Sequence, residues 1–533
     1  MLSLLTSVGY QLWVLPALFA IPVIGAIGIW VHGALSPRRA DGDEVASGAA
    51  ATPRAIALVT FAIEFVVSLG LWWSLEPANP AWQSVVDFPW IPSWGIRFTI
   101  GVDGISVMMI LLTTFIMLLS IGGSWTSIRT RTHSYYALLL VMTTGMLGVF
   151  MALDLFLFYV MWEVMLIPMY FIIGVWGGDR RIYASIKFFI YTFLGSLLML
   201  VAILYLWLHA QNIVTHQSSF GYDYLMQHAL IGSRQALWLF AAFFVAFAVK
   251  VPMFPLHTWL PDAHTEAPTA GSVILAGIML KMGTYGFLRF ALPLFPDASM
   301  TPWVRSIILG LAVIGIIYGA LVSMVQPDFK RLVAYSSVSH LGFVMLGIFA
   351  LTLQSVQGAL MVMINHGIST GALFLLIGML YERRHTRLLS AYGGIARVVP
   401  MFAVLLTLVS LSSIGLPGTN GFVGEFLVLI GAFKSEPMFA FIATIGVILA
   451  ACYLLWAIQR IIYTPLDKPE NEHVPDLNRR ELGIMGALAI VILWIGIYPA
   501  PILHRMERSA NNLVQQVQAG SGQRTASAAL GVR

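Results

Sequence analysis

"FAVKVPMFPLHTWLPDAHTEAP", residues 247–268, is the stretch that decides how this chain folds. A long apolar segment reaches Lys250, and four prolines follow, at positions 252, 255, 261 and 268. Proline removes a backbone donor and breaks a helix interior. Lipid cannot satisfy the backbone groups that such a break leaves free. The stretch therefore predicts an interrupted helix that is buried in protein or lines a wet cavity, with a lysine at the interruption.

The composition around this stretch is that of a polytopic membrane protein. The 533 residues are 59% hydrophobic and only 10% charged, with a mean hydropathy of +0.85, whereas soluble proteins carry about 25% charged residues. Apolar runs of the length that crosses a bilayer recur throughout. They predict fourteen membrane spans, numbered 1–14 in chain order, near 11–31, 54–75, 104–123, 134–152, 154–176, 183–209, 236–258, 268–292, 303–324, 331–351, 355–381, 400–430, 437–463 and 483–503.

Two interrupted spans suggest an internal repeat. Span 7 is broken after Lys250, and span 12 contains "GLPGTNG" with Glu425 just beyond it. A near-common offset of about 175 residues relates these features and predicts two five-helix units, spans 4–8 and 9–13. An odd number of helices per unit makes the second inverted relative to the first, an arrangement that transporters use. The expected divisions are 1–130, 131–295, 296–465 and 466–533.

The distribution of basic residues predicts the orientation. Most of the 29 Lys and Arg residues lie in loops after odd-numbered spans, and five occur after even-numbered spans, at Arg97, Arg234, Arg289, Arg305 and Lys434. By the positive-inside rule the odd loops face the cytoplasm and both termini lie outside. This asymmetry explains the pI near 9.2 without a nucleic-acid partner. The first apolar run has no cleavage pattern and is expected to be span 1.

Several chemistries find no support in the sequence. A single cysteine, Cys452, leaves no intrachain disulfide and no cysteine-ligated iron–sulfur cluster. No phosphate-binding loop and no dinucleotide-binding strand–turn–helix pattern occur, and the histidines form no metal-ligand cluster. If the chain moves something, the energy must come from an ion gradient or a partner.

The informative residues are the polar ones inside spans. A charged side chain at a span centre costs about 2.5–3.5 kcal/mol, so such residues are functional candidates. Lys187 near the start of span 6 is expected to snorkel, and Glu64 in span 2 remains undecided between lipid and partner contact. His340 could instead be a neutral histidine bonded to a serine. The candidates for a chain of titratable groups are Glu163, Lys250, Lys281, His340, His366 and Glu425.

The motifs around these residues carry a resemblance. "VKVPMFPLHTWLPDAHTEAPTAGSVILAGIMLKMGTYGFLRF", "DFKRLVAYSSVSHLGFVMLG", "NHGISTGALFLLIGMLYERRHTR" and "SSIGLPGTNGFVGEFLVLIGAF" resemble the antiporter-like membrane subunits of respiratory complex I, over roughly residues 90–460. Within that family the chain is most similar to the M type, since "FTIGVDGISVMMILLTTF" looks M-like and no long lateral helix is expected after span 14. The polar loop 38–53 and the tail after 505 lie outside the resemblance.

The resemblance implies a function and a set of roles. It implies proton translocation driven by NADH:quinone oxidoreduction in partner subunits, which would carry the NADH, FMN, Fe–S clusters and quinone, while this chain binds no cofactor. Glu163 and Lys250 would form an interacting pair. Lys281 would be the central relay, His340 and His366 the link, and Glu425 the terminal site.

Burial and ion pairing shift a pKa in opposite directions, so opening and closing the Glu163–Lys250 pair could release and hold a proton. The two side chains are expected to meet, directly or through one water, in at least one state. The implied partners are neighbouring membrane subunits and lipid, in the cell inner (plasma) membrane. Two alternatives stay open: a subunit of a multisubunit sodium/proton antiporter or membrane-bound hydrogenase, and a non-transporting scaffold.

Overall fold

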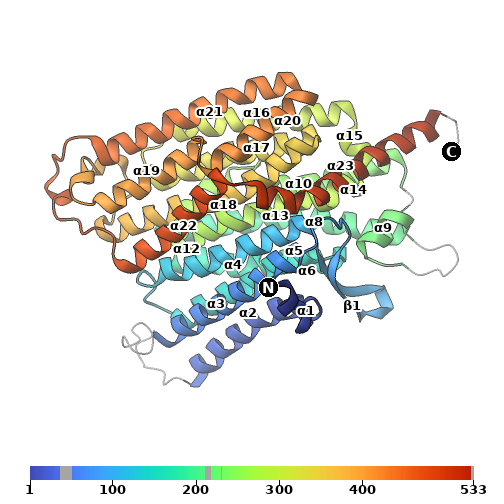
Figure 1. Cartoon of the computed structure of the whole chain (residues 1–533), viewed down its shortest axis with the longest axis horizontal. Helices are drawn as coiled ribbons and strands as arrows, with labels where there is room; N and C mark the ends of the chain where they lie inside the picture. Colours follow the sequence, from blue (N-terminus) through green and yellow to red (C-terminus); the bar gives the residue numbers. More distant parts are fainter. Residues whose placement is uncertain (36–50, 211–217, 230, 530–533) are drawn as a thin grey trace.

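The chain folds into a bundle of long helices that run side by side (Figure 1). The structure is a computed structural model and describes residues 1–35, 51–210, 218–229 and 231–529. Within these residues, thirteen helices or helix runs are long and apolar enough to cross a membrane. The remaining expected span, span 12 at 400–430, is divided between two shorter helices, α19 and α20. The predicted all-α polytopic fold is confirmed. Most of the loop expected at 38–53 lies outside the described residues.

The elements follow the predicted spans closely. The helices up to residue 294 are α1 (Leu2–Ser7), α2 (Tyr10–Leu35), α3 (Ala51–Ser74), α4 (Gly104–Ser124), α5 (Thr132–Met151), α6 (Leu155–Val164), α7 (Leu166–Trp176), α8 (Arg181–His209), α9 (Tyr222–His228), α10 (Ser233–Lys250), α11 (Trp259–Glu266), α12 (Thr269–Ile274), α13 (Leu280–Gly286) and α14 (Leu292–Leu294). The later ones are α15 (Pro296–Met300), α16 (Pro302–Met324), α17 (Phe329–Ala350), α18 (Leu353–Arg384), α19 (Pro400–Ile414), α20 (Asn420–Ser435), α21 (Pro437–Ile458), α22 (Arg479–Ile497) and α23 (Ala500–Ala529).

Short elements complete the chain. Three π-helical turns are η2 (Leu275–Met279), η3 (Phe287–Ala291) and η6 (Gln459–Tyr463), and four 3-10 turns are η1 (Pro92–Trp94), η4 (Leu389–Ala391), η5 (Ile395–Arg397) and η7 (Pro469–Asn471). Strands β1 (Gln83–Ile91) and β2 (Ile96–Val102) pair antiparallel. The apolar pattern did not indicate this hairpin, because its residues alternate over too short a length to stand out among the spans.

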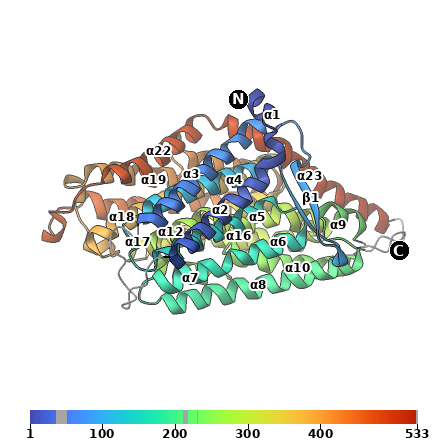
Figure 2. The same ribbon diagram turned by 90° about the horizontal axis from the view of Figure 1, so that it is seen from below.

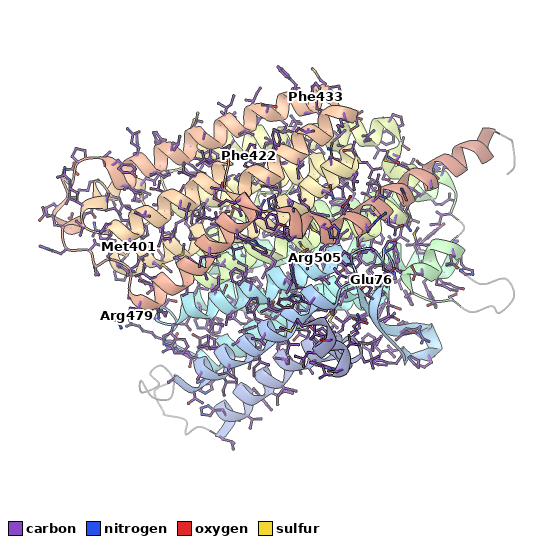
Figure 3. All side chains as sticks on the ribbon, in the orientation of Figure 1. Glu76, Met401, Phe422, Phe433, Arg479 and Arg505 are labelled. Atoms are coloured by element: carbon purple, nitrogen blue, oxygen red, sulfur yellow. The ribbon has the colours of Figure 1, made fainter. Side chains whose placement is uncertain are left out.

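The two ends of the bundle differ in character. The end with the β1–β2 hairpin and α23, on the right in Figure 1, is called the hairpin end below. Met401 and Arg479, near the starts of α19 and α22, lie together at the opposite end (Figure 3), called the basic end. There a cavity of about 500 Å³ is lined by Arg129, Lys330 and Arg387 among others. The described odd-numbered connections thus gather at one end of the bundle.

Three spans are interrupted where the sequence contains prolines or glycines. Span 7 is divided because α10 ends at Lys250 and α11 begins at Trp259. Span 12 is divided between α19 and α20, and the turn between them contains Gly415 and Gly418 at φ +85° and +89°, a conformation that glycine adopts without steric cost. Span 5 is interrupted at Met165, between α6 and α7. The inverted relation between the two units stays a prediction.

The central helices are those that carry most candidate residues. In spans 8 and 11, 100% of the residues in the most apolar 18-residue stretch are buried, whereas 39% are buried in the corresponding stretches of α2, α3 and α8. Figure 2 shows α8 and α10 side by side along one face, so the bundle surrounds spans 8 and 11 with more exposed helices. A position at the centre keeps Lys281 and His366 away from lipid, as the cost of an intramembrane charge requires.

The residues after span 14 form α23, a long helix that the sequence did not predict. Its buried positions, among them Met506, Ala510 and Val517, recur at helical spacing and pack on α4, α14, α15 and α18. The guanidinium of Arg505 lies 3.6 Å from the ring centroid of Trp72, near the middle of the molecule (Figure 3). The tail after residue 505, which lies outside the resemblance, is therefore part of a helix that packs against the bundle.

Candidate functional site

The site is centred on Lys281 and His366. Lys281 Nζ lies 2.6 Å from Nδ1 of His366 and also donates to the carbonyl oxygen of Ala276. Ala276 belongs to η2, where the regular helical ladder is interrupted, and π-helical turns of this kind occur often at functional sites. Both side chains are buried, Lys281 completely. The structure therefore brings together two candidates that are 85 residues apart in sequence.

Two glycines allow spans 8 and 11 to approach at this point. A Cβ added to Gly367 would lie 2.9 Å from the carbonyl oxygen of Gly277, so any larger residue would separate the helices. Gly367 directly follows His366, and Gly277 directly follows Ala276. The close crossing of the two backbones thus sets the distance between Lys281 and His366.

His340 and Glu425 continue the line of polar groups. The rings of His366 and His340 are 5.8 Å apart at their centroids, edge to face, and His340 Nδ1 lies 2.9 Å from Oε1 of Glu425. Tyr453 contacts Nε2 of His340 at 3.5 Å. Nε2 of His366 has no hydrogen-bond partner within the described chain, and a small cavity of about 20 Å³ touches both histidines and Glu425. That volume can hold one water molecule, which would join the two histidines.

The break in span 12 is tied to span 11 by side chains that sequence patterns did not single out. Asn365 Nδ2 donates to the carbonyl oxygen of Asn420 at 2.5 Å. Ser412 Oγ donates to Oδ1 of Asn420, and Ser369 Oγ contacts Ser412 Oγ at 2.7 Å. Small polar residues in a span are common and give no signal by themselves. By bonding Asn420 at the start of α20, they fix the helix that presents Glu425.

Lys250 lies at the other end of the site. It is 1% exposed, and its Nζ lies 3.7 Å from Sδ of Met165 and 5.4 Å from the ring centroid of Trp162. A Cβ added to Gly283 would lie 3.1 Å from Cβ of Lys250, so α10 meets the helix that carries Lys281. Lys250 is therefore next to span 8, at the point where span 7 is interrupted.

Glu163 and Lys250 do not form an ion pair in this structure. Glu163 is only partly buried, and its Oε1 has no hydrogen-bond partner among the described residues. It directly follows Trp162, whose ring faces the Lys250 ammonium, and the charge of Lys250 acts on it. Its place at the Met165 interruption would let a small movement of α6 open or close the pair. The expected contact is absent from this conformation and remains a prediction for another.

Two further candidates have different outcomes. Lys187 forms an ion pair with Asp262 of α11 at 2.7 Å, so a partner within the bundle accounts for its charge and snorkelling need not be invoked. Glu64 is completely buried and both of its carboxylate oxygens lack a hydrogen-bond partner in the described part of the chain. It lies away from the line of contacts described above.

A polar region leads from the basic end toward Lys281. The buried ammonium of Lys330 lines the cavity at that end and donates to the carbonyl oxygen of Ala267 at 2.5 Å. His264 of α11 is fully buried, and neither of its ring nitrogens has a hydrogen-bond partner in the part of the chain that the structure describes. The charges of Lys330 and Lys281 both act on this ring. His264 was not a candidate from sequence, since a lone histidine in a proline-rich turn carries no distinctive spacing.

Comparison with known proteins identifies the family. The family described as "NADH:quinone oxidoreductase/Mrp antiporter, TM" matches residues 152–450, which contain all six candidate residues. The chain belongs to this family. It is 46% identical to NADH-quinone oxidoreductase subunit M of Rhodobacter capsulatus, over 89% of this chain and 93% of that protein. It is 44% identical to NADH-ubiquinone oxidoreductase chain 4 of Chondrus crispus, over 87% and 92% respectively.

A solved structure supports the same membership. A chain of respiratory complex I from Thermus thermophilus with bound NADH matches with a TM-score of 0.83 at 31% identity, over 94% of this chain and 99% of that one. The resemblance to antiporter-like complex I subunits of the M type is therefore confirmed. Among the described residues, no group of three or more His, Cys, Asp or Glu side chains could hold a metal ion.

Proposed function

We propose that this family member is the proton-translocating membrane subunit of an NADH:quinone oxidoreductase. The observation that carries the proposal is the line of contacts from Lys281 through His366 and His340 to Glu425. Every member of this line is a group that can bind and release a proton. Lys250 and Glu163 would form its other end, where opening and closing of the pair would drive protons along the line.

The geometry suggests how one proton moves. A proton on Lys281 Nζ can pass to Nδ1 of His366 over 2.6 Å, and a water in the small cavity would carry it to His340. From Nδ1 of His340 it reaches Oε1 of Glu425. Refilling would come from the basic-end cavity by way of Lys330 and His264. Residues that only position the line, such as Asn420, need no proton of their own.

The energy would come from outside the chain. NADH, FMN, Fe–S clusters and quinone would be held by partner subunits, and neighbouring antiporter-like subunits would flank this one. We place the protein in the cell inner (plasma) membrane as a multi-pass subunit with both termini outside. The alternative, a subunit of a sodium/proton antiporter, is less favoured because the relatives at 46% and 44% identity bear the names of complex I subunits.

Lys281→Ala in the whole complex tests the proposal. The purified complex is reconstituted into liposomes and supplied with NADH and a quinone, and proton uptake is followed with a pH-sensitive dye alongside NADH oxidation. We expect Lys281→Ala to assemble and to lower the protons moved per NADH, while Lys434→Ala, an exposed lysine bonded to Gln354, leaves that ratio unchanged. An unchanged ratio in Lys281→Ala would refute the relay.

A further inference from the structure

A second polar cluster lies on span 8, at the hairpin end. Arg289 of η3 forms an ion pair with Asp103, with Nη2 2.7 Å from Oδ1, and the two side chains are only 10% and 4% exposed. Nε of Arg289 donates to the hydroxyl oxygen of Tyr285 at 3.2 Å, and the guanidinium lies 4.5 Å from the ring centroid of Trp82. The guanidinium is thus held by an anion, a hydroxyl and an aromatic face.

This cluster points toward the relay on one side. Tyr285 is one helical turn beyond Lys281, and its hydroxyl donates to the carbonyl oxygen of Phe150 and contacts Ser106 Oγ at 2.9 Å. Arg289 is eight residues beyond Lys281, roughly 12 Å along a helix. Tyr285 therefore lies between Lys281 and Arg289 along span 8, and its hydroxyl contacts both Ser106 and Arg289.

On its other side the cluster faces a cavity. A space of about 230 Å³ is lined by Asp103, Arg289, Tyr222 and Asp223, and by Asn512 and Gln516 of α23. α23 is fixed against the pair, because the Gly104 backbone N–H donates to Ser509 Oγ at 3.1 Å. A Cβ on Gly104 would come within 2.0 Å of the carbonyl oxygen of Arg505. The cavity is polar enough for water, and Arg289, which lines it, also contacts the Tyr285 hydroxyl and Ser106 Oγ.

We propose that the Asp103–Arg289 ion pair is a proton barrier that closes the hairpin end of span 8. Unlike lysine or histidine, arginine does not release its proton in proteins, so Arg289 cannot pass one on. Its fixed positive charge also repels an approaching hydronium ion, as an arginine does in selective pores.

Arg289 further keeps Asp103 from becoming a carrier. Asp103 accepts from the backbone N–H groups of Ile105 and Ser106 as the cap of α4, and the guanidinium is its counter-ion. Without that counter-ion a buried carboxyl favours its protonated form. It could then take protons from the cavity and exchange them with Ser106 and Tyr285. Arg289 is thus the barrier, and Asp103 is the group that would carry protons once Arg289 is lost.

The test measures passive proton leak without substrate. Complex in liposomes is given a pH step without NADH or quinone, and the decay of the gradient is followed with an internal pH-sensitive dye. We expect Arg289→Gln to leak several-fold faster than wild type. Arg305→Gln is the matched control, because Arg305 is a similarly paired arginine at the hairpin end, bonded to Glu436 at 2.9 Å but remote from the cavity lining.

A double variant separates a barrier from a packing role. Asp103→Asn keeps the helix cap and removes the group that would carry protons, so Asp103→Asn/Arg289→Gln should leak less than Arg289→Gln alone. A loosened structure would leak as much or more. If Arg289→Gln fails to assemble, Arg289→Lys keeps the charge but introduces a cation that can release its proton, and a leak faster than that of wild type is still expected.

A proton leak no faster than that of wild type, in whichever of these single variants assembles, would overturn the barrier. A double variant that leaks as fast as the single variant would also overturn it. The inference rests on the proposed relay, since a leak needs Lys281 to exchange protons. The relay itself fails on a different measurement, the unchanged proton-to-NADH ratio of Lys281→Ala.

Discussion

Gly367→Ala should slow proton pumping through geometry alone, because it touches no titratable group. The new Cβ would lie 2.9 Å from the Gly277 carbonyl oxygen, whereas ordinary contact begins at 3.4 Å. Spans 8 and 11 must therefore separate by about 0.5 Å, at an overpacking cost of about 1–3 kcal/mol. If they separate as rigid units, the distance between Lys281 and His366 grows from 2.6 Å to about 3.1 Å. Since a 1 Å misplacement can cost about a hundredfold in rate, half of that corresponds to about tenfold.

A control on the same helix makes the measurement specific. Gly371 is one turn beyond Gly367, and a Cβ there would meet no atom closer than 3.6 Å. The initial rate of NADH-driven proton uptake is compared in liposomes for wild type, Gly367→Ala and Gly371→Ala, after native gels confirm equal assembly. We expect about tenfold slower uptake in Gly367→Ala and no change in Gly371→Ala. Equal rates in all three would show that the helix crossing does not set the rate of transfer.

Three other predictions concern Glu425, the Glu163–Lys250 pair and Asp154. Glu425→Gln keeps the length of the side chain beside His340 but cannot release a proton, so proton uptake should be abolished in an assembled complex. Glu425→Asp should retain part of the uptake. More uptake in Glu425→Gln than in Glu425→Asp would contradict a terminal proton site. Glu163→Gln and Lys250→Ala should each lower proton uptake. The double variant should lose little more than the single variant with the larger loss, because a shared switch is broken only once. Strictly additive losses would show that the two residues act independently. Burial raises the pKa of Asp154, which caps α6 in the turn between α5 and α6, from 3.8 to about 6. Its neutral form is therefore favoured in the fold, and this stability is present below about pH 4 and lost as the pH rises through about 6. In Asp154→Asn the thermal unfolding midpoint of the purified complex should therefore vary less with pH over that interval than in wild type. The same variation with pH in both proteins would contradict this.

Features that depend on local composition were predictable from the sequence. Apolar runs of about 20 residues give the spans because the hydrocarbon core has a fixed thickness, and proline and glycine place the interruptions after Lys250 and before Glu425. The six candidate residues were found because charge is costly inside a bilayer. The contacts that join Lys281 to Glu425 agree with that selection.

Features that depend on packing between distant segments were not predictable. Arg289 was counted among the loop charges, since it follows the apolar centre of span 8, yet it is held inside the bundle by Asp103. α23 has too few apolar residues to stand out, and its folding relies on the surface of α4. The separation of Glu163 from Lys250 depends on the placement of α6, which charge alone does not determine.

The π-helical turn η2 has a consequence for the angular register of span 8. A π-helical turn closes its ring one residue later than an α-helical turn, and each residue of an α-helix turns the chain by about 100°. Lys281 therefore points about 100° away from the direction that an uninterrupted helix from Thr269 would give it. A substitution that straightened η2 without shortening the chain would therefore aim the lysine at a different neighbour from His366, whereas deletion of a single residue within 275–279 would restore a regular helix and keep the direction of the lysine. The π-helical turn thus accommodates one residue more than a regular helix would need, and in a chain of this length that turn is itself a condition for proton transfer.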